Sequence, residues 1–206
     1  MKAKRFLVWT GFTFLLYVFG CAAFQVAGDV QAGRNALQTG RPLEAVVYLT
    51  RAAELDPNYL TPSRIRVGAL TYLGRAYYEI GKNAEARSTL ERAVSINKDD
   101  SLAHLYLGLT LLRSGDRERG RKEIDDSLQA IDDTLEYIAA DRLTGFYWDP
   151  TMQIRNYIRN TLGRKLNDAE LAAAAERIGR DLDEEFDRAR RDEAQHRGGS
   201  DSGGGS

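Results

Sequence analysis

The sequence predicts an all-α protein in which helical hairpins repeat along the chain and further helices follow them. Three observations carry this prediction. Glycines recur at a fixed pair of separations, small and apolar residues recur at the same separations, and the C-terminal part keeps apolar residues at helical spacing.

Internal repetition is the strongest of these signals. Equivalent residues are separated first by 41 and then by 34 positions, as for Gly33, Gly74 and Gly108. The other columns with these separations are Gly40/Gly81/Gly115, Ala45/Ala86/Gly120, Leu49/Leu90/Ile124 and Ala52/Ala93/Ser127. The period is therefore 34 residues, with a seven-residue insertion, Leu60–Arg66, between the first and second units.

These columns resemble the small and apolar positions of the tetratricopeptide repeat (TPR) family, whose repeat is also 34 residues long. The segments that carry the resemblance are AGRNALQTGRPLEAVVYLTRAAELDP (32–57), YLGRAYYEIGKNAEARSTLERAVSINK (72–98) and, more weakly, YLGLTLLRSGDRERGRKEIDDSLQAID (106–132). The resemblance implies a solenoid of about three repeats within residues 22–134. The expected units are 26–59, 67–100 and 101–134.

Small residues are expected where the two helices of each hairpin meet. A glycine inside a helix costs roughly 1 kcal/mol relative to alanine, so close helix packing must compensate. The residues assigned to this packing are Gly33, Ala45, Ala52, Gly74, Ala86, Ala93 and Gly108. Gly40 and its equivalents should end the first helix in a left-handed conformation. Thr61-Pro62 should start the first helix of unit two early.

The N-terminal segment, residues 1–21, has the pattern of an export signal. Three cations among the first five residues precede the uncharged run Phe6–Gly20, and the single cysteine, Cys21, follows directly. Val18-Phe-Gly-Cys21 resembles a bacterial lipobox, although Phe19 is bulkier than the residue usual there. The resemblance implies that Cys21 is lipidated and becomes the first mature residue.

Two other interpretations of this segment stay open. Apolar character continues to Gly28, so residues 6–28 are long enough to serve as an uncleaved membrane anchor. Cleavage at Cys21-Ala-Ala23 would instead release a secreted protein. Each interpretation places the rest of the chain outside the cytoplasm or on a membrane. The lipoprotein, membrane-attached in the bacterial cell envelope, is the favoured one.

Three further segments follow the repeats. Residues 135–166 are expected to form a helical cap, with the aromatic run Phe146-Tyr147-Trp148 either plugging the repeat stack, which we favour, or exposed for recognition. Residues 167–197 should form one long amphipathic helix that either caps the third repeat or pairs with a second copy as a coiled coil. Residues 198–206 are rich in glycine and serine and predict a flexible tail.

The TPR resemblance also implies a concave groove lined by the first helix of each unit. The groove residues implied are Arg34, Leu37, Gln38, Thr71, Arg75, Tyr78 and Glu79. In unit three the same stripe is Leu102, Leu105, Leu109 and Leu112. Four leucines exposed together would be an aggregation hazard, so we expect residues 135–166 to cover them and leave units one and two open.

Nothing in the sequence points to catalysis, a cofactor or a metal. The two histidines are far apart, one cysteine cannot build a zinc site, and no phosphate-binding or nucleophile motif is present. Basic and acidic residues nearly balance, at 29 and 30, which argues against a nucleic-acid partner. We therefore expect a non-enzymatic protein.

The function expected is that of a membrane-tethered scaffold that binds a helix or extended peptide of a partner protein and assists the assembly of an envelope complex. The envelope role rests on architectural analogy alone. The alternative is a structural subunit that forms a homodimer through its C-terminal helix and has no peptide ligand.

Overall fold

The computed structural model describes residues 24–200, with side chains through His196. Cys21 and the predicted tail after residue 200 lie outside the described residues. A first helix occupies residues 24–38. The helices that follow are α2 (Pro42–Leu55), α3 (Ala69–Glu79), α4 (Asn83–Ile96), α5 (Ser101–Arg113), α6 (Arg117–Ala139), the 3₁₀ turn η1 (Gly145–Tyr147), α7 (Gln153–Leu162) and α8 (Asp168–Ser200).

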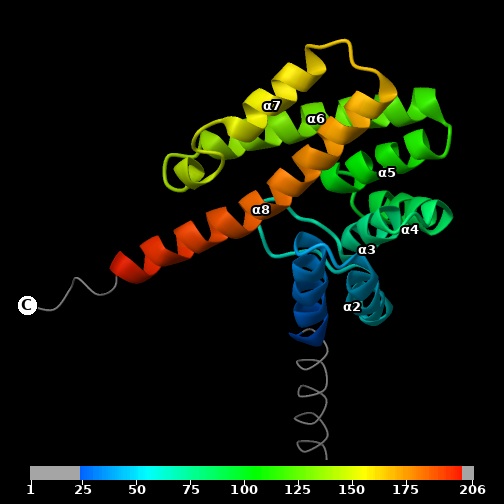
Figure 1. The fold of residues 1–206 in the computed structure, drawn as a ribbon. Helices are drawn as coiled ribbons and strands as arrows, with labels where there is room; N and C mark the ends of the chain where they lie inside the picture. The colour runs from blue at the N-terminus through cyan, green and yellow to red at the C-terminus, as the bar shows by residue number, and fades with distance from the viewer. Residues whose placement is uncertain (1–23, 201–206) are drawn as a thin grey trace, which may run out of the picture.

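Figure 1 shows the helices of the repeat region stacked as antiparallel pairs, the first helix with α2, α3 with α4 and α5 with α6. Between residues 24 and 200 there is no β-strand, only an isolated bridge between Leu60 and Gly68. The prediction of an all-α helical-repeat solenoid is confirmed. Across the same residues every helix is too short or too polar to serve as a membrane span.

The hairpin turns have one backbone geometry, set by a glycine. Gly40, Gly81 and Gly115 have φ values of 71°, 77° and 93°. After each glycine the next amide donates to a carbonyl five residues back, at 2.8 Å, 2.9 Å and 3.0 Å for the three turns. This is the 6→1 bond of a Schellman C-cap, in which the left-handed residue is usually glycine. The glycine column therefore fixes the direction of each second helix.

A second glycine column sets how closely the paired helices approach. A Cβ atom built on Gly33 would lie 2.4 Å from Leu49 Cγ, one on Gly74 2.4 Å from Leu90 Cγ, and one on Gly108 2.8 Å from Ile124 Cγ1. Alanines that the second helices of units one and two present to these contacts are buried, namely Ala45, Ala52, Ala86 and Ala93. The absence of a side chain on one helix thus makes room for a leucine or isoleucine from the other.

Asp100 joins the second hairpin to the third. Its buried carboxylate caps α5 by accepting from the Ala103 amide, and it also accepts from the Thr71 hydroxyl at 2.7 Å and the Gly68 amide. Burial raises the pKa of Asp100, although these hydrogen bonds oppose the rise.

The first helix of unit two, α3, does not begin early at Thr61-Pro62, as the sequence predicted. Gly68 forms the N-cap of α3, and the insertion before it folds as a loop.

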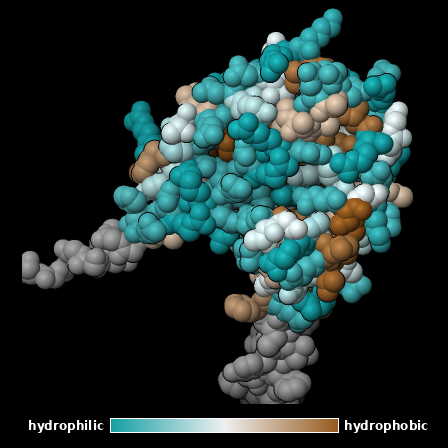
Figure 2. Space-filling view, in the orientation of Figure 1, coloured by the Kyte–Doolittle hydropathy of each residue, from teal (hydrophilic) through white to brown (hydrophobic). Residues whose placement is uncertain are grey.

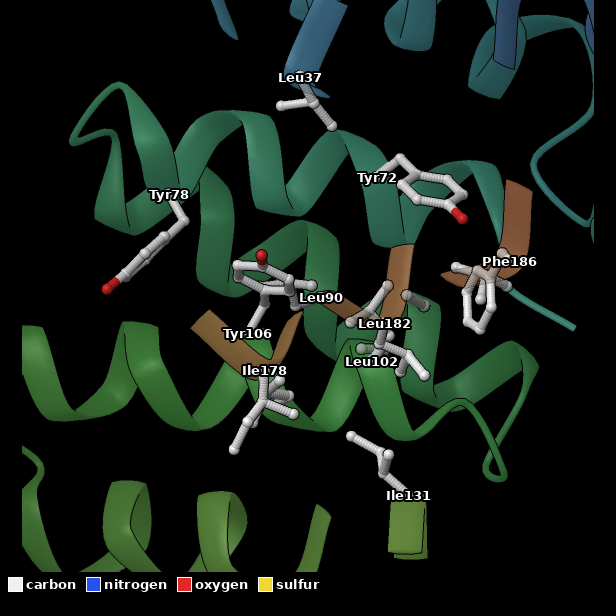
Figure 3. Packing of buried hydrophobic residues seen from close by; sticks show 14 of the residues in the cluster. Leu37, Tyr72, Tyr78, Leu90, Leu102, Tyr106, Ile131, Ile178, Leu182 and Phe186 are labelled. Carbon is white, nitrogen blue, oxygen red and sulfur yellow. The ribbon is translucent and has the colours of Figure 1, made fainter. Parts of the chain in front are cut away.

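Residues 135–166 do not cover the leucines of unit three, which corrects the sequence-based expectation. Helix α6 runs on to Ala139, and α7 then returns along α6, where Arg159 pairs with Asp132 at 3.0 Å. In place of this segment, α8 lies against α5. A Cβ on Gly179 would lie 3.3 Å from Leu105 Cδ2, and Figure 3 shows Ile178 and Leu182 among the core residues of α5.

The residues of the aromatic run Phe146-Tyr147-Trp148 differ in burial, so the run is neither wholly buried nor wholly exposed. Trp148 is 1% exposed, with its ring centroid 6.1 Å from that of Phe186 on α8, and its indole N–H donates to Glu193. Phe146 is 56% exposed. Trp148 therefore fastens α8 to the segment before α7, whereas Phe146 lies on the surface.

The glycine contacts give the first prediction. Gly74→Ala should lower the free energy of unfolding by about 1–3 kcal/mol, because the new methyl group overlaps Leu90 in a close-packed interface. Gly28→Ala, also in a helix, should raise it by up to about 1 kcal/mol, because nothing lies within 4 Å of its Cβ position and alanine favours helix. Urea unfolding of both variants measures the difference. Equal effects at the two positions would contradict the packing account.

Candidate protein-binding groove

The concave face is lined by the first helix of each unit, and its side chains follow from the repeat register. Arg34 and Arg75 each come directly after a packing glycine, so they occupy equivalent places on the first helix and on α3. The residue at the same place in unit three is Leu109. Both guanidinium groups are almost fully buried, since Arg34 is 3% exposed and Arg75 is 1% exposed. A buried cation needs a partner, and the groove contains one.

That partner is the C-terminal helix, which lies along the groove. In Figure 1, α8 runs diagonally across the repeat stack from α6 toward the first helix. Asp183, near the middle of α8, is completely buried. Its carboxylate accepts from Arg34 Nη2 at 2.7 Å and from Arg75 Nη1 at 3.3 Å. The Tyr72 hydroxyl and the Gln38 amide donate to the same carboxylate, each at 3.3 Å.

Two further carboxylates on α8 extend this contact in both directions. Asp187 accepts from Arg34 Nη1 at 3.0 Å and from Gln38 Nε2 at 2.9 Å. Glu176 accepts from the Tyr78 hydroxyl at 2.5 Å and from Arg113 Nη2 at 3.2 Å. The three acids, at positions 176, 183 and 187, fall on one face of a helix of 3.6 residues per turn. We call these three residues the acidic stripe of α8.

Aromatic rings separate the cations along the groove. The Arg34 guanidinium lies 5.3 Å from the Tyr72 ring centroid, that of Arg75 5.4 Å from Tyr106, and that of Arg113 3.6 Å from Tyr78. These are cation–π distances. The ion pairs of Arg34 and Arg75 with Asp183 are buried among these rings and experience a low dielectric, whereas the pair of Arg113 with Glu176 is partly exposed.

A second stripe of α8 is apolar and packs beside the acidic one. Its members are Leu171, Ala175, Ile178, Leu182, Phe186 and Ala189, all buried. Figure 3 shows Ile178, Leu182 and Phe186 within the same core as Leu102 and Tyr106 of α5. The face that α8 turns to solvent is mostly hydrophilic in Figure 2. The helix is therefore held by two adjacent stripes, one apolar and one charged.

Burial also changes the ionisation of the groove tyrosines. It raises the pKa of Tyr106 to about 12 and raises the pKa of Tyr72 well above its ordinary value. The pKa of Tyr78 is raised as well, first by burial and then by its hydrogen bond to Glu176. In each case the interior disfavours the phenolate. The neutral hydroxyls of Tyr72 and Tyr78 are donors to carboxylates, and ionisation would turn each into a repelling anion.

The structure places the residues predicted for the groove in different surroundings. Arg34, Gln38, Arg75 and Tyr78 all contact the acidic stripe of α8. Leu37 is a buried core residue, and Glu79 accepts from Arg75 Nε at 2.8 Å. Thr71 does not line the groove, because its hydroxyl is committed to Asp100 between two hairpins. Units one and two are only partly open, because α8 occupies part of the groove and leaves a cavity of about 480 Å³ lined by Leu37, Arg75 and Tyr78, among others.

Sequence reasoning missed the residues that complete the groove. Tyr72, Tyr106 and Arg113 belong to the lining, and the acidic stripe belongs to the occupant. One signal for the stripe was present, namely the separations of seven and four residues among its acids. Within residues 24–200, no cluster of three or more His, Cys, Asp or Glu side chains could hold a metal ion. In this chain the groove holds α8.

The central carboxylate gives the second prediction. Asp183→Ala should lower the free energy of unfolding by roughly 3–5 kcal/mol, because it leaves two buried guanidinium groups short of their shared anion. Glu184→Ala, the matched control on the exposed face of α8, should change it by less than about 0.5 kcal/mol. Denaturant unfolding measures both. Similar losses for the two variants would show that Asp183 has no special role.

The third prediction concerns alkaline pH. Above about pH 10 the unfolded chain loses phenolic protons, whereas the folded chain keeps those of Tyr72, Tyr78 and Tyr106. The folded state then binds more protons than the unfolded state, so stability falls as pH rises. Thermal unfolding between about pH 8 and about pH 11 should show this fall. Tyr72→Phe should reduce its steepness, and a flat profile in the wild type would contradict the assignment.

Comparison with known proteins agrees with this architecture. Residues 36–105 match the tetratricopeptide repeat family, a stretch that runs from the first helix through α2, α3 and α4 into α5. No curated protein matches the chain. The matched stretch contains the turns at Gly40 and Gly81 and the whole of the second hairpin. Residues 36–105 are therefore similar to tetratricopeptide repeats, and the described part of the chain is an all-α helical-repeat solenoid, a fold typical of protein–protein interaction scaffolds.

Proposed function

We propose that this protein is a non-catalytic scaffold, tethered to a membrane of the bacterial cell envelope by its N-terminal segment, that binds a partner protein and assists assembly of an envelope complex. The observation that carries the proposal is the groove itself. It holds a helix through buried cations and aromatic rings that bond to the acidic stripe and through apolar residues that pack against the apolar stripe. Recognition of a helix in a groove is an established mode of protein binding.

The tether is supported by the sequence of residues 1–21, with its cationic start, uncharged run and Cys21. The first described residues lead into the helix 24–38, at the edge of the repeat stack away from α6 and α7 (Figure 1). An N-terminal attachment there is compatible with an accessible repeat domain.

The alternative, a structural subunit that self-associates through α8, needs an available apolar face on that helix. The apolar stripe of α8 is already buried within the same chain. For two copies to form a coiled coil through this face, α8 would first have to dissociate from the groove. The structure therefore favours a partner protein over a homodimer formed by paired C-terminal helices.

The fourth prediction tests the tether. In its bacterial host the wild-type protein should be cleaved before Cys21, carry lipid on that residue and partition into detergent. Cys21→Ala should block processing and keep the leader attached. Intact-mass analysis of membrane fractions reads both outcomes. An unmodified wild-type chain that still begins at Met1 would reject the lipoprotein and favour an uncleaved anchor.

Co-purification from the same membrane fraction tests the scaffold role. The result expected is a stoichiometric foreign protein bound to the wild-type chain after mild detergent extraction. Recovery of a clean self-dimer with no other component would contradict the proposal and favour the structural subunit.

A further inference from the structure

We infer that the groove is closed in cis by α8, and that the partner which opens it is an amphipathic helix with carboxylates at the spacing of Glu176, Asp183 and Asp187. This inference rests on the proposed function and names the chemistry of its partner. Three features of the structure support it: the independence of α8, the selectivity of the buried charges and the geometry of the two stripes.

Helix α8 resembles a bound ligand more than a continuation of the solenoid. Its N-terminus is capped within its own sequence, since the Glu170 amide donates to Asn167 Oδ1 and the Asn167 amide to Glu170 Oε2, each at 2.9 Å. This reciprocal pair is a capping box. The connection from α7, residues 163–167, is exposed or half-buried along its whole length. The helix can therefore keep its first turn when its contacts with the groove are lost.

The buried charges make the groove selective. An apolar helix of the same shape would leave Arg34 buried without a counter-charge and Arg75 with Glu79 alone, and uncompensated buried charge is strongly unfavourable. A helix is accepted only if it brings a carboxylate to the place of Asp183, which lies within hydrogen-bonding distance of both arginines. Well-packed apolar residues often hold helices together at least as strongly as buried ion pairs. The charges therefore define which helix fits and in which register.

The other two carboxylates, Glu176 and Asp187, determine in which direction a helix can lie in the groove. Glu176 contacts α3 and α5 through Tyr78 and Arg113, whereas Asp187 contacts the first helix through Arg34 and Gln38. The apolar stripe lies beside them on α8 and packs against α5. A helix inserted in the reverse direction would place these acids against the wrong units. The partner chemistry is thus an acidic helix with Ile, Leu and Phe on the adjacent stripe.

The covalent connection explains why the groove is closed in the isolated chain. A segment joined by a short linker competes at an effective concentration on the order of millimolar. A partner helix in trans must exceed that competition, so weakening α8 should raise the apparent affinity for an added helix. The two outer acids are suited to this test because they are only partly buried and Asp183 stays in place.

The experiment uses purified full-length chain and a fluorescent synthetic peptide of residues 167–196, which includes the capping residue Asn167. In the double variant Glu176→Gln/Asp187→Asn, the peptide should bind at least about tenfold more tightly than to the wild type, because the internal helix has lost hydrogen bonds to charged groups. A control peptide carrying Asp183→Asn should bind the double variant at least about tenfold more weakly than the native peptide. Hydrogen exchange of α8 in the chain should rise as the native peptide saturates the groove.

Several outcomes would overturn the inference. Equal binding of the two peptides would show that the groove does not select the central carboxylate. Absence of peptide binding, with α8 still protected from exchange in the double variant, would show that α8 is a permanent part of the fold. Dimerisation of the double variant without peptide uptake would assign the groove to α8 of a second copy. Failure to find a lipid or a cellular partner bears on the proposed function and leaves these peptide measurements unchanged.

Discussion

A single buried carboxylate connects the repeat stack to the C-terminal helix. Asp183 is fully buried and lies between Arg34 and Arg75, which the repeat places at equivalent positions of two successive units. Each guanidinium is placed by the glycine that precedes it, because that glycine fixes which face of the helix contacts the second helix of the hairpin. Helix packing, groove charge and the position of α8 thus follow from one register. The groove chemistry therefore depends on the close packing at Gly33 and Gly74, the residues directly before the two arginines.

Much of this architecture was accessible from the sequence. The left-handed backbone at Gly40 and its equivalents favours glycine, and these positions recur at fixed separations. The hairpins and the groove positions of Arg34 and Arg75 follow from that recurrence. What each side chain contacts is harder to foresee. Thr71 was assigned to the groove because of its register, but the nearby Asp100 gives it a buried hydrogen-bond partner.

The place where α8 packs could not be predicted from the local sequence pattern. Glu184 and Asp183 are neighbours on a charge-rich helix, yet one is exposed and the other fully buried. That difference arises from residues far earlier in the chain, chiefly Arg34 and Arg75, which lie 149 and 108 positions before Asp183 and bond to it. The segment 135–166 was assigned as the cover because it comes next in sequence. The length of α6, 23 residues against 14 in α4, carries that segment past the groove and leaves the space to α8.

The central claim is that the ion pair between Arg75 and Asp183 holds α8 in the groove. A double-mutant cycle with Arg75→Met and Asp183→Leu measures their coupling free energy directly. The account predicts a coupling of about 1–3 kcal/mol, because Arg75 and Asp183 form a buried ion pair that each single variant breaks, while Arg34 stays paired with Asp183 in one variant and Glu79 with Arg75 in the other. The exposed pair Arg87 and Glu91 provides the control, with almost no coupling. Additive effects at Arg75 and Asp183 would contradict the account.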